Sequence, residues 1–217
     1  MYLTRAEADS IEQRTAALEA AAGVQVITAV VGKADVYAEL PWRAFALGSV
    51  LAGLIIVVAD SLRPDWVSAH AALVHVLTML GVGALSGLLA IFVPAYARMF
   101  LGRLRRDAEV RQYAESIFLR RELFATRGRD GILVLVCLFE RKVEILADIG
   151  LHGRIGEPQW RSVIARMTPL LAGGRIAEAL LQGLARLDEV LRERLLETQP
   201  DATNELRDRP IEERGAR

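Results

Sequence analysis

The 217-residue sequence contains a single cysteine, which excludes a disulfide within the chain. It also lacks an excess of either charge, because 27 lysine and arginine residues are balanced by 27 aspartate and glutamate residues. The basic footprint of a nucleic-acid-binding protein is therefore missing, and we expect no nucleic-acid partner. No HExxH, P-loop or dinucleotide-binding motif occurs. Apolar residues make up 53% of the chain, which excludes disorder of the chain as a whole.

Charged residues are missing from two long stretches, Ala44 to Ala59 and Trp66 to Ala97. Extended by Leu40 to Trp42, with only Arg43 intervening, the first stretch reaches the roughly 20 residues that a membrane-spanning helix needs. The second is longer than one crossing requires, and its best spanning part is Leu77 to Tyr96. A short connector links the two, so the sequence predicts a transmembrane helical hairpin over residues 40–100, with the lipid bilayer as its partner.

Small residues recur on both predicted spans. Gly83 and Gly87 form a small-xxx-small pair in the second span, and Gly48, Ala52 and Gly53 offer a matching surface in the first. Such positions let two membrane helices approach closely. We therefore expect the two spans to contact each other through these residues.

The basic residues that flank the spans predict the orientation of the hairpin. They precede the first span and follow the second, whereas the connector holds only Arg63; the flanking residues are Lys33, Arg43, Arg98, Arg103, Arg105 and Arg106. The positive-inside rule then places both flanks and both termini in the cytoplasm, with the hairpin in the cell (inner) membrane. Residues 1–10 lack the apolar core of a signal peptide, so the first span is expected to serve as its own insertion signal. The reversed topology, with the polar domain outside the cytoplasm, is the alternative.

The polar arms on either side of the hairpin predict one α/β domain. An amphipathic helix and a β-branched strand precede the hairpin, and a charged helix, a two-stranded β-hairpin and two further helices follow it. Their expected ranges are Thr4 to Ala22, Val24 to Val31, Arg103 to Ala125, Ile132 to Phe139, Val143 to Asp148, Trp160 to Leu171 and Arg175 to Leu196. Neither arm buries its apolar face alone, so we expect residues 1–39 and 101–197 to form a small central sheet flanked by helices. Residues 198–217 are polar and are predicted to form a disordered tail.

The second arm carries a recognisable arrangement of residues. Arg127 to Ile155 reads RGRDGILVLVCLFERKVEILADIGLHGRI, in which one strand is followed by Glu140-Arg141 and the next ends in Ala147-Asp148 before Gly150. This arrangement resembles the TPM domain, the family of thylakoid-lumen and photosystem-repair phosphatase-like proteins, and Leu3 to Val31 looks like its opening helix and strand. The resemblance implies an α/β sandwich, here split by the inserted hairpin. Some members are described as acid phosphatases that bind divalent metals, and others as accessory factors of membrane complexes.

Two carboxylates are the strongest candidates for a metal site. Asp130 precedes one predicted strand and Asp148 ends its antiparallel partner, so both lie toward the same edge, and both match acidic positions of the family's motif. They are candidate ligands for Ca²⁺ or another divalent metal, and Asp35 is a third group expected to approach them. The alternative is structural, with Asp130 as a turn residue beside Gly131 and Asp148 as a strand terminator.

The remaining reactive side chains have structural interpretations. Glu140 and Arg141 are expected in an exposed turn, and Cys137 inside an apolar strand, where a nucleophilic thiolate is disfavoured. His152 is a candidate metal ligand or an exposed loop residue, and the other two histidines, His70 and His75, are expected at the membrane interface. The sequence thus favours an interaction or accessory module for membrane complexes, with a metal-dependent phosphatase-like hydrolase as the alternative.

Overall fold

The structure of the chain is a computed structural model that describes residues 2–62, 69–151, 153–195 and 208–216. It divides into two compact units. The first, which we call the α/β unit, is built from two separate parts of the sequence, Met1–Asp35 and Asp107–Arg217. The second, the hairpin unit, is the segment between them, Val36–Arg106.

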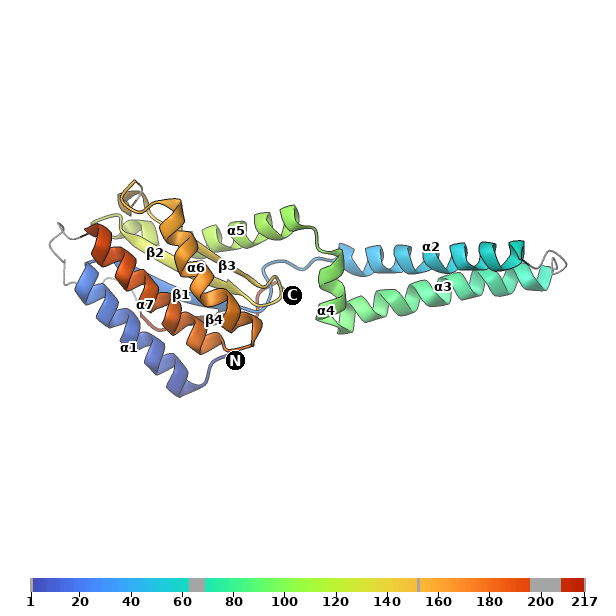
Figure 1. The fold of residues 1–217 in the computed structure, drawn as a ribbon, viewed down its shortest axis with the longest axis horizontal. Coiled ribbons are helices and arrows are strands. Elements are labelled where there is room, and N and C mark those ends of the chain that lie inside the picture. The colour runs from blue at the N-terminus through green and yellow to red at the C-terminus, as the bar shows by residue number, and fades with distance from the viewer. Residues whose placement is uncertain (1, 63–68, 152, 196–207, 217) are drawn as a thin grey trace. The chain divides into compact units, whose positions relative to one another are not determined.

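A four-stranded sheet forms the centre of the α/β unit (Figure 1). Its strands are β1 (Gln25–Val31), β2 (Gly131–Cys137), β3 (Lys142–Ala147) and β4 (Ile211–Glu213), in the order β3-β2-β1-β4. β1 runs parallel to both β2 and β4, whereas β3 runs antiparallel to β2. The predicted pairing of the strand before the hairpin with the sheet built after it is confirmed.

Every residue of β1 and β2 is buried, because helices cover both faces of the sheet. Successive side chains alternate between two apolar clusters, as the two-residue period of a strand requires. In β2, Ile132, Val134 and Val136 enter one cluster and Leu133, Leu135 and Cys137 enter the other. The continuous apolar runs of the sequence therefore mark central strands.

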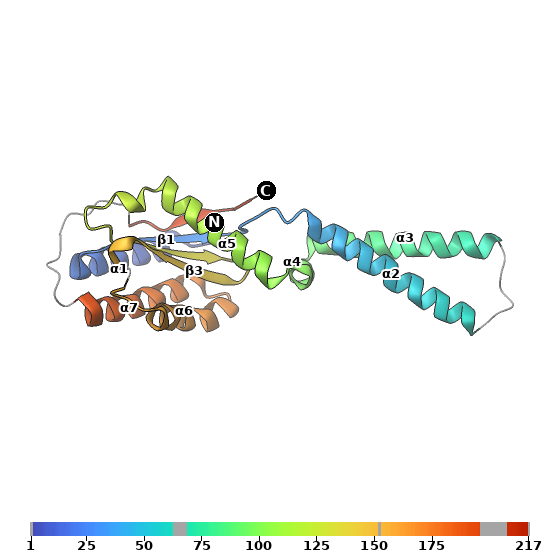
Figure 2. The same cartoon turned by 90° about the horizontal axis from the view of Figure 1, so that it is seen from above.

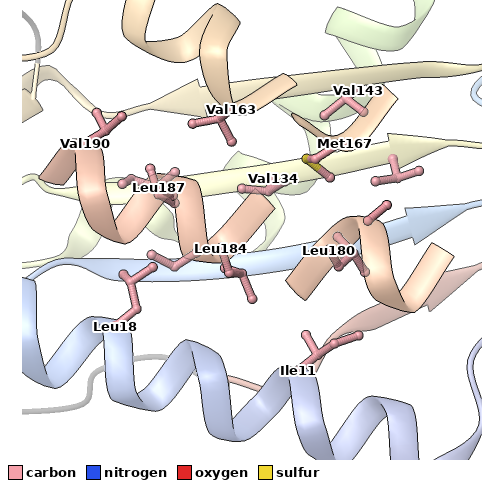
Figure 3. Close-up of a cluster of buried hydrophobic side chains, with 14 of the residues drawn as sticks. Ile11, Leu18, Val134, Val143, Val163, Met167, Leu180, Leu184, Leu187 and Val190 are labelled. Carbon is pink, nitrogen blue, oxygen red and sulfur yellow. The ribbon is translucent and has the colours of Figure 1, made fainter. Parts of the chain in front are cut away.

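Helices α1 (Arg5–Ala22), α6 (Glu157–Ala172) and α7 (Ile176–Leu195) lie on one face of the sheet, and α5 (Arg103–Arg120) lies on the other (Figure 2). Helix α7 packs beside both α1 and α6 and supplies the centre of the larger cluster against the strands (Figure 3). Its inward residues are Leu180, Leu184, Leu187 and Val190, which recur at the helical period. The predicted α/β class, with a small sheet flanked by helices, is confirmed.

The boundaries of α1 follow from its caps. The Thr4 side chain accepts the N–H of Glu7, and the Glu7 carboxylate accepts the N–H of Thr4, which is the predicted capping box. Gly23 ends the helix with a φ of 66°, a left-handed conformation that glycine adopts without steric cost. Both boundaries agree with the sequence prediction.

Two expectations for the polar arms are wrong. The helix after the hairpin ends at Arg120 rather than Ala125, because Glu122 has a φ of 54° and a short 3-10 turn, η2 (Leu123–Ala125), follows. The expected disordered tail contains β4, since backbone groups at the edge of β1 pair with Ile211–Glu213. Only residues 208–216 of that tail belong to the described part of the chain.

The hairpin unit consists mainly of two long apolar helices, α2 (Glu39–Ser61) and α3 (Ala69–Phe92). A short helix, α4 (Pro94–Ala97), and a 3-10 turn, η1 (Arg98–Phe100), follow them. Both long helices have the length and composition to cross a membrane. Most of their large apolar side chains point away from the unit, and Ile55, for example, is 68% exposed.

Small residues line the contact between α2 and α3, as the sequence predicted. A Cβ added at Gly48 would lie 2.8 Å from the Cβ of Ser86, and one added at Gly83 would clash with the Ser49 hydroxyl and lie 3.0 Å from the Phe45 carbonyl oxygen. The Ser86 hydroxyl also donates to the carbonyl oxygen of Ala44 at 2.7 Å. Small residues at such a contact let two helix backbones approach closely, which is how many membrane helices associate.

Substitution of Gly83 by leucine is expected to separate the two helices, because the side chain would overlap α2. We would measure the rate of oxidative cross-linking between cysteines placed at Phe45 and Gly87, because a Cβ at Gly87 lies 3.6 Å from that of Phe45, within the range of a disulfide. The rate is expected to fall at least tenfold. Gly81→Leu is the matched control, since open space surrounds Gly81. Equal rates in the two variants would contradict the described packing.

Candidate functional site

The two carboxylates singled out in the sequence lie at the edge of the sheet where β2 begins and β3 ends. The N–H of Asp148 donates to the carbonyl oxygen of Gly131 at 2.9 Å, so Asp148 lies directly beside the start of β2. Asp130 is the residue before that start, and its N–H donates to the Thr126 hydroxyl at 3.1 Å. We call this region, centred on Asp130 and Asp148, the acidic edge.

Asp148 is engaged in an ion pair. Its carboxylate is almost fully buried, and it accepts two hydrogen bonds from Arg129, at 2.7 Å from Nε and 3.1 Å from Nη2. The N–H of Ile149 also donates to it at 2.7 Å. Hydrogen bonds to Asp148 raise the pKa of the Arg129 guanidinium, so Arg129 stays positively charged beside this carboxylate. The negative charge of Asp148 is therefore already balanced within the protein.

The turn before β2 holds Arg129 in the position that this ion pair needs. Arg129 has a φ of 51°, a left-handed conformation uncommon for a residue with a side chain. Its carbonyl oxygen accepts the N–H of Gly150 at 2.8 Å. A Cβ at Gly150 would lie 2.5 Å from that same oxygen and would also clash with the carbonyl oxygen of Gly128. Only glycine at position 150 lets the two loops approach this closely.

Glu19 is a third acidic residue near this edge, and it is not among the candidate residues predicted from the sequence. It lies at the end of α1 with 5% of its surface exposed, and its Oε1 accepts the N–H of Val26 at 2.6 Å. Burial, together with the negative charges of Asp208 and Asp130, raises the pKa of Glu19 to about 8. The available signal was its position four residues after the inward-facing Thr15, on the buried side of the helix.

The divalent-metal site predicted for Asp130 and Asp148 stays a prediction. Among the described residues, no group of three or more His, Cys, Asp or Glu side chains is placed to hold a metal ion. Ca²⁺ takes six to eight oxygen ligands, whereas Asp148 is paired with a guanidinium. A divalent cation would have to compete with Arg129 for that carboxylate. The third histidine, His152, lies outside the described residues.

The expectations for Asp35 and Glu140 are also wrong. Both residues lie at the end of the sheet opposite to the acidic edge. Asp35 follows β1, whose last residue pairs with Cys137 at the end of β2, so it lies away from the start of β2 where Asp130 is found. Glu140 was expected to be exposed, yet it is only 2% exposed and its Oε1 accepts the N–H of Ala34 at 2.9 Å. The chain leaving β1 passes over the β2–β3 turn and buries this carboxylate.

Cys137 is fully buried within β2, as the sequence predicted. Burial raises the pKa of its thiol, with a further contribution from the negative charges of Glu140 and Glu144. A thiol with a raised pKa is a poor nucleophile. Its position in the apolar cluster identifies it as a packing residue.

A hollow of about 660 Å³ lies beside the acidic edge, between α5 and the end of β3. Its lining is mainly apolar, with an ion pair between Arg111 and Glu115 at 3.0 Å. Leu119 and Ile149 on this lining are more than half exposed. The complete lining is Arg111, Glu115, Phe118, Leu119, Leu146, Ala147, Asp148 and Ile149. The acidic edge therefore borders an apolar surface that is open to solvent.

The comparisons with known proteins agree with this fold. No curated protein matches the sequence. The NMR structure of the BA42 protein from the psychrophilic bacterium Bizionia argentinensis is similar, with a TM-score of 0.58 and 11% identity, and the match covers 98% of this chain and 96% of BA42. At this identity the similarity shows the fold. Residues 99–190, which include α5, β2, β3 and α6, match the TPM domain, so a TPM domain is detected in this chain.

Proposed function

We propose that this protein is anchored in the cell membrane by α2 and α3, and that its α/β unit is an interaction module for membrane complexes. The observation that carries the proposal is the outward direction of the apolar side chains of both long helices. In water such a surface is costly, at roughly 25 cal/mol per Å² of apolar area. In a bilayer the same surface contacts lipid, and the hairpin needs no other cover.

The ends of the hairpin support one orientation. Arg43 donates to the carbonyl oxygen of Phe100 at 3.0 Å, and Arg105 pairs with Glu39 at 2.9 Å, so basic residues near the start of α2 and after α3 lie at the same end of the unit. Arginine side chains at a helix end reach the headgroup region. By the positive-inside rule this end, both termini and the α/β unit lie in the cytoplasm.

Membrane anchoring is tested by alkaline extraction of membranes from cells that express the protein. The intact chain is expected to stay with the membrane pellet, because its hairpin is held by lipid contact. A variant with residues 36–106 replaced by a glycine-serine linker is expected in the supernatant. Recovery of the intact chain in the supernatant would refute the anchor.

Orientation is tested with a protease added to inverted vesicles and to spheroplasts. The exposed loop at Arg127 and Arg129 is the cleavage site to follow. Cleavage in inverted vesicles alone is expected for a cytoplasmic α/β unit. Cleavage in spheroplasts alone would show the reverse topology and leave the anchor itself intact.

The hollow beside α5 supports the interaction role, because its exposed leucine and isoleucine form an apolar surface with a charged rim, as protein interfaces do. We expect Ile149→Asp to remove a stoichiometric partner from the complex purified in mild detergent. Ala165→Asp, at an exposed position of α6 on the opposite face of the sheet, is the matched control and is expected to retain it. Loss of the partner from both variants, or from neither, would contradict the assignment of this hollow as the partner-binding surface.

The alternative is a divalent-metal-dependent phosphatase-like hydrolase that uses Asp130 and Asp148. It is favoured by the placement of both carboxylates at one edge, with the buried Glu19 nearby. It requires Asp148 to be released from Arg129, because the guanidinium occupies the place beside the carboxylate where a metal ion would bind.

Thermal unfolding in detergent with Ca²⁺, Mg²⁺ or Mn²⁺ separates the two functions. An ion that binds the native state raises the unfolding midpoint by mass action. For the interaction module we expect the same small response in the wild type, Asp130→Asn and Asp148→Asn. A metal-dependent rise in the wild type that both variants lose, together with turnover of phosphomonoesters, would establish the hydrolase.

A further inference from the structure

The C-terminal segment of the chain occupies the open edge of β1. Residues Ile211–Glu213 pair in parallel with Ala29, Val30 and Val31. Beyond this short ladder, the N–H of Gly32 donates to the carbonyl oxygen of Glu213 at 2.9 Å, and the N–H of Ala216 donates to that of Lys33 at 3.0 Å. The segment thus binds as an added strand, in the manner of a peptide bound by β-augmentation.

Side chains of the segment are recognised individually. The Glu212 carboxylate accepts the N–H groups of both Tyr2 and Leu3, the second at 3.2 Å. The Glu213 carboxylate accepts the Tyr113 hydroxyl at 2.5 Å and is 3.4 Å from Arg120. Backbone N–H groups, a hydroxyl and a guanidinium all favour a negatively charged ligand. The edge of β1 is therefore a built site for two consecutive acidic residues.

The fit of the backbone is equally restrictive. Gly215 has a φ of 81°, and a Cβ there would clash with the carbonyl oxygen of Lys33. Across the contact, a Cβ at Gly32 would lie 2.7 Å from the carbonyl oxygen of Arg214. Ile211 packs against the apolar cluster under α5. The bound segment therefore has a definite pattern, an apolar residue, two acidic residues, any residue and then glycine.

The strand is short, and its attachment rests on few groups. Three residue pairs define the ladder between β4 and β1, whereas seven define that between β1 and β2. Because β4 belongs to the same chain as β1, it competes for the β1 edge through its high effective concentration and not through additional contacts. A separate peptide with the same side chains makes the same contacts once β4 is removed or its attachment is weakened.

We propose that the β1 edge, bounded by Tyr2 and Tyr113, is a binding site for an extended acidic segment of a partner protein with the pattern of residues 211–215. The intramolecular β4 occupies this site until such a partner displaces it. This proposal rests on the proposed role as an interaction module and names the chemistry of its partner.

The test uses the chain ended at residue 207 and a fluorescent peptide of residues 208–217, with binding followed by anisotropy in detergent. Saturable binding is expected for the shortened chain, and at least tenfold weaker binding for the intact chain, whose site is filled. Two altered peptides serve as controls that leave the protein unchanged. Gly215→Val and the double substitution Glu212→Gln and Glu213→Gln are each expected to weaken binding at least tenfold.

Several results would overturn the proposal. One is a shortened chain that unfolds cooperatively yet does not bind the peptide, and another is equal binding of the Gly215→Val peptide. If the shortened chain does not fold, the intact chain with Glu213→Gln is used in its place, because this substitution weakens the attachment of β4. A gain in peptide affinity of less than fivefold over the intact wild type would then refute the displacement of β4 by the peptide. A dimer mass for the intact chain by light scattering, lost on shortening, would show that a second copy fills the site instead. Each result is independent of the membrane extraction that tests the anchor.

Discussion

Replacing Glu19 with glutamine is expected to abolish most of the pH dependence of folding stability between about pH 5 and pH 8. The pKa of Glu19 is raised to about 8 by burial and by the nearby carboxylates of Asp208 and Asp130, so the folded protein holds a proton that the unfolded chain releases. The stability that this proton supplies is complete below the ordinary glutamate pKa and is lost as pH rises through 8. Across that window the wild type should lose about 1.4 kcal/mol per pH unit.

The glutamine variant keeps the hydrogen bond to Val26, because its amide oxygen accepts the N–H that Oε1 accepts in the wild type. It cannot acquire the buried negative charge. We therefore expect the variant to be more stable than the wild type at pH 9, as measured by denaturant unfolding at a series of pH values. Asp9→Asn, at an exposed position of the same helix, is the control and should retain the wild-type slope. An unchanged slope in Glu19→Gln would assign the pH dependence to other groups.

Substitution of Gly150 by alanine is expected to destabilise the α/β unit by about 1–3 kcal/mol, the usual cost of overpacking. The added Cβ would overlap the carbonyl oxygens of Gly128 and Arg129. Those atoms are backbone, so they cannot move aside as a flexible side chain would. The turn that positions Arg129 against Asp148 has to shift, and the bidentate ion pair is lost with it.

Thermal unfolding measures this effect, and a fall of several degrees in the midpoint is expected for a chain of this size. Gly102→Ala is the matched control, because no atom lies within 4 Å of a Cβ added there. Equal midpoints for the two variants would mean that the loops at the acidic edge separate at little cost. That result would also make release of Asp148, which the hydrolase alternative requires, more accessible.

The candidate site was predictable in part. The alternation of turn, strand and antiparallel strand placed Asp130 and Asp148 at one edge, and the hydrogen bond from Asp148 to Gly131 agrees with that placement. The partner of Asp148 was not predictable, because Arg129 reaches it through a left-handed backbone conformation that no sequence pattern indicates. The metal interpretation of these carboxylates stays a hypothesis for the unfolding experiment.

Burial of the two unexpected glutamates depends on chain crossings. Glu140 belongs to a charged turn that local rules place in solvent, and only the passage of Ala34 over it supplies the cover and the donor. Glu19 is buried by the start of β1 and by neighbours from distant parts of the sequence, Asp130 and Asp208. The helical position of Glu19 indicates that it lies on the buried side of α1, but contacts with such distant residues leave no local signature in the sequence.

The sequence by itself determined the elements with a clear period or a clear boundary. These are the capped helix α1, the apolar strands β1 and β2, the amphipathic α7 and the two long apolar helices with their small contact residues. Only the tertiary structure decided the ion pair of Asp148, the burial of Glu19 and Glu140, and the place of β4 beside β1. Periodicity and caps act between residues a few positions apart, whereas burial and strand pairing depend on which distant segments the fold brings together.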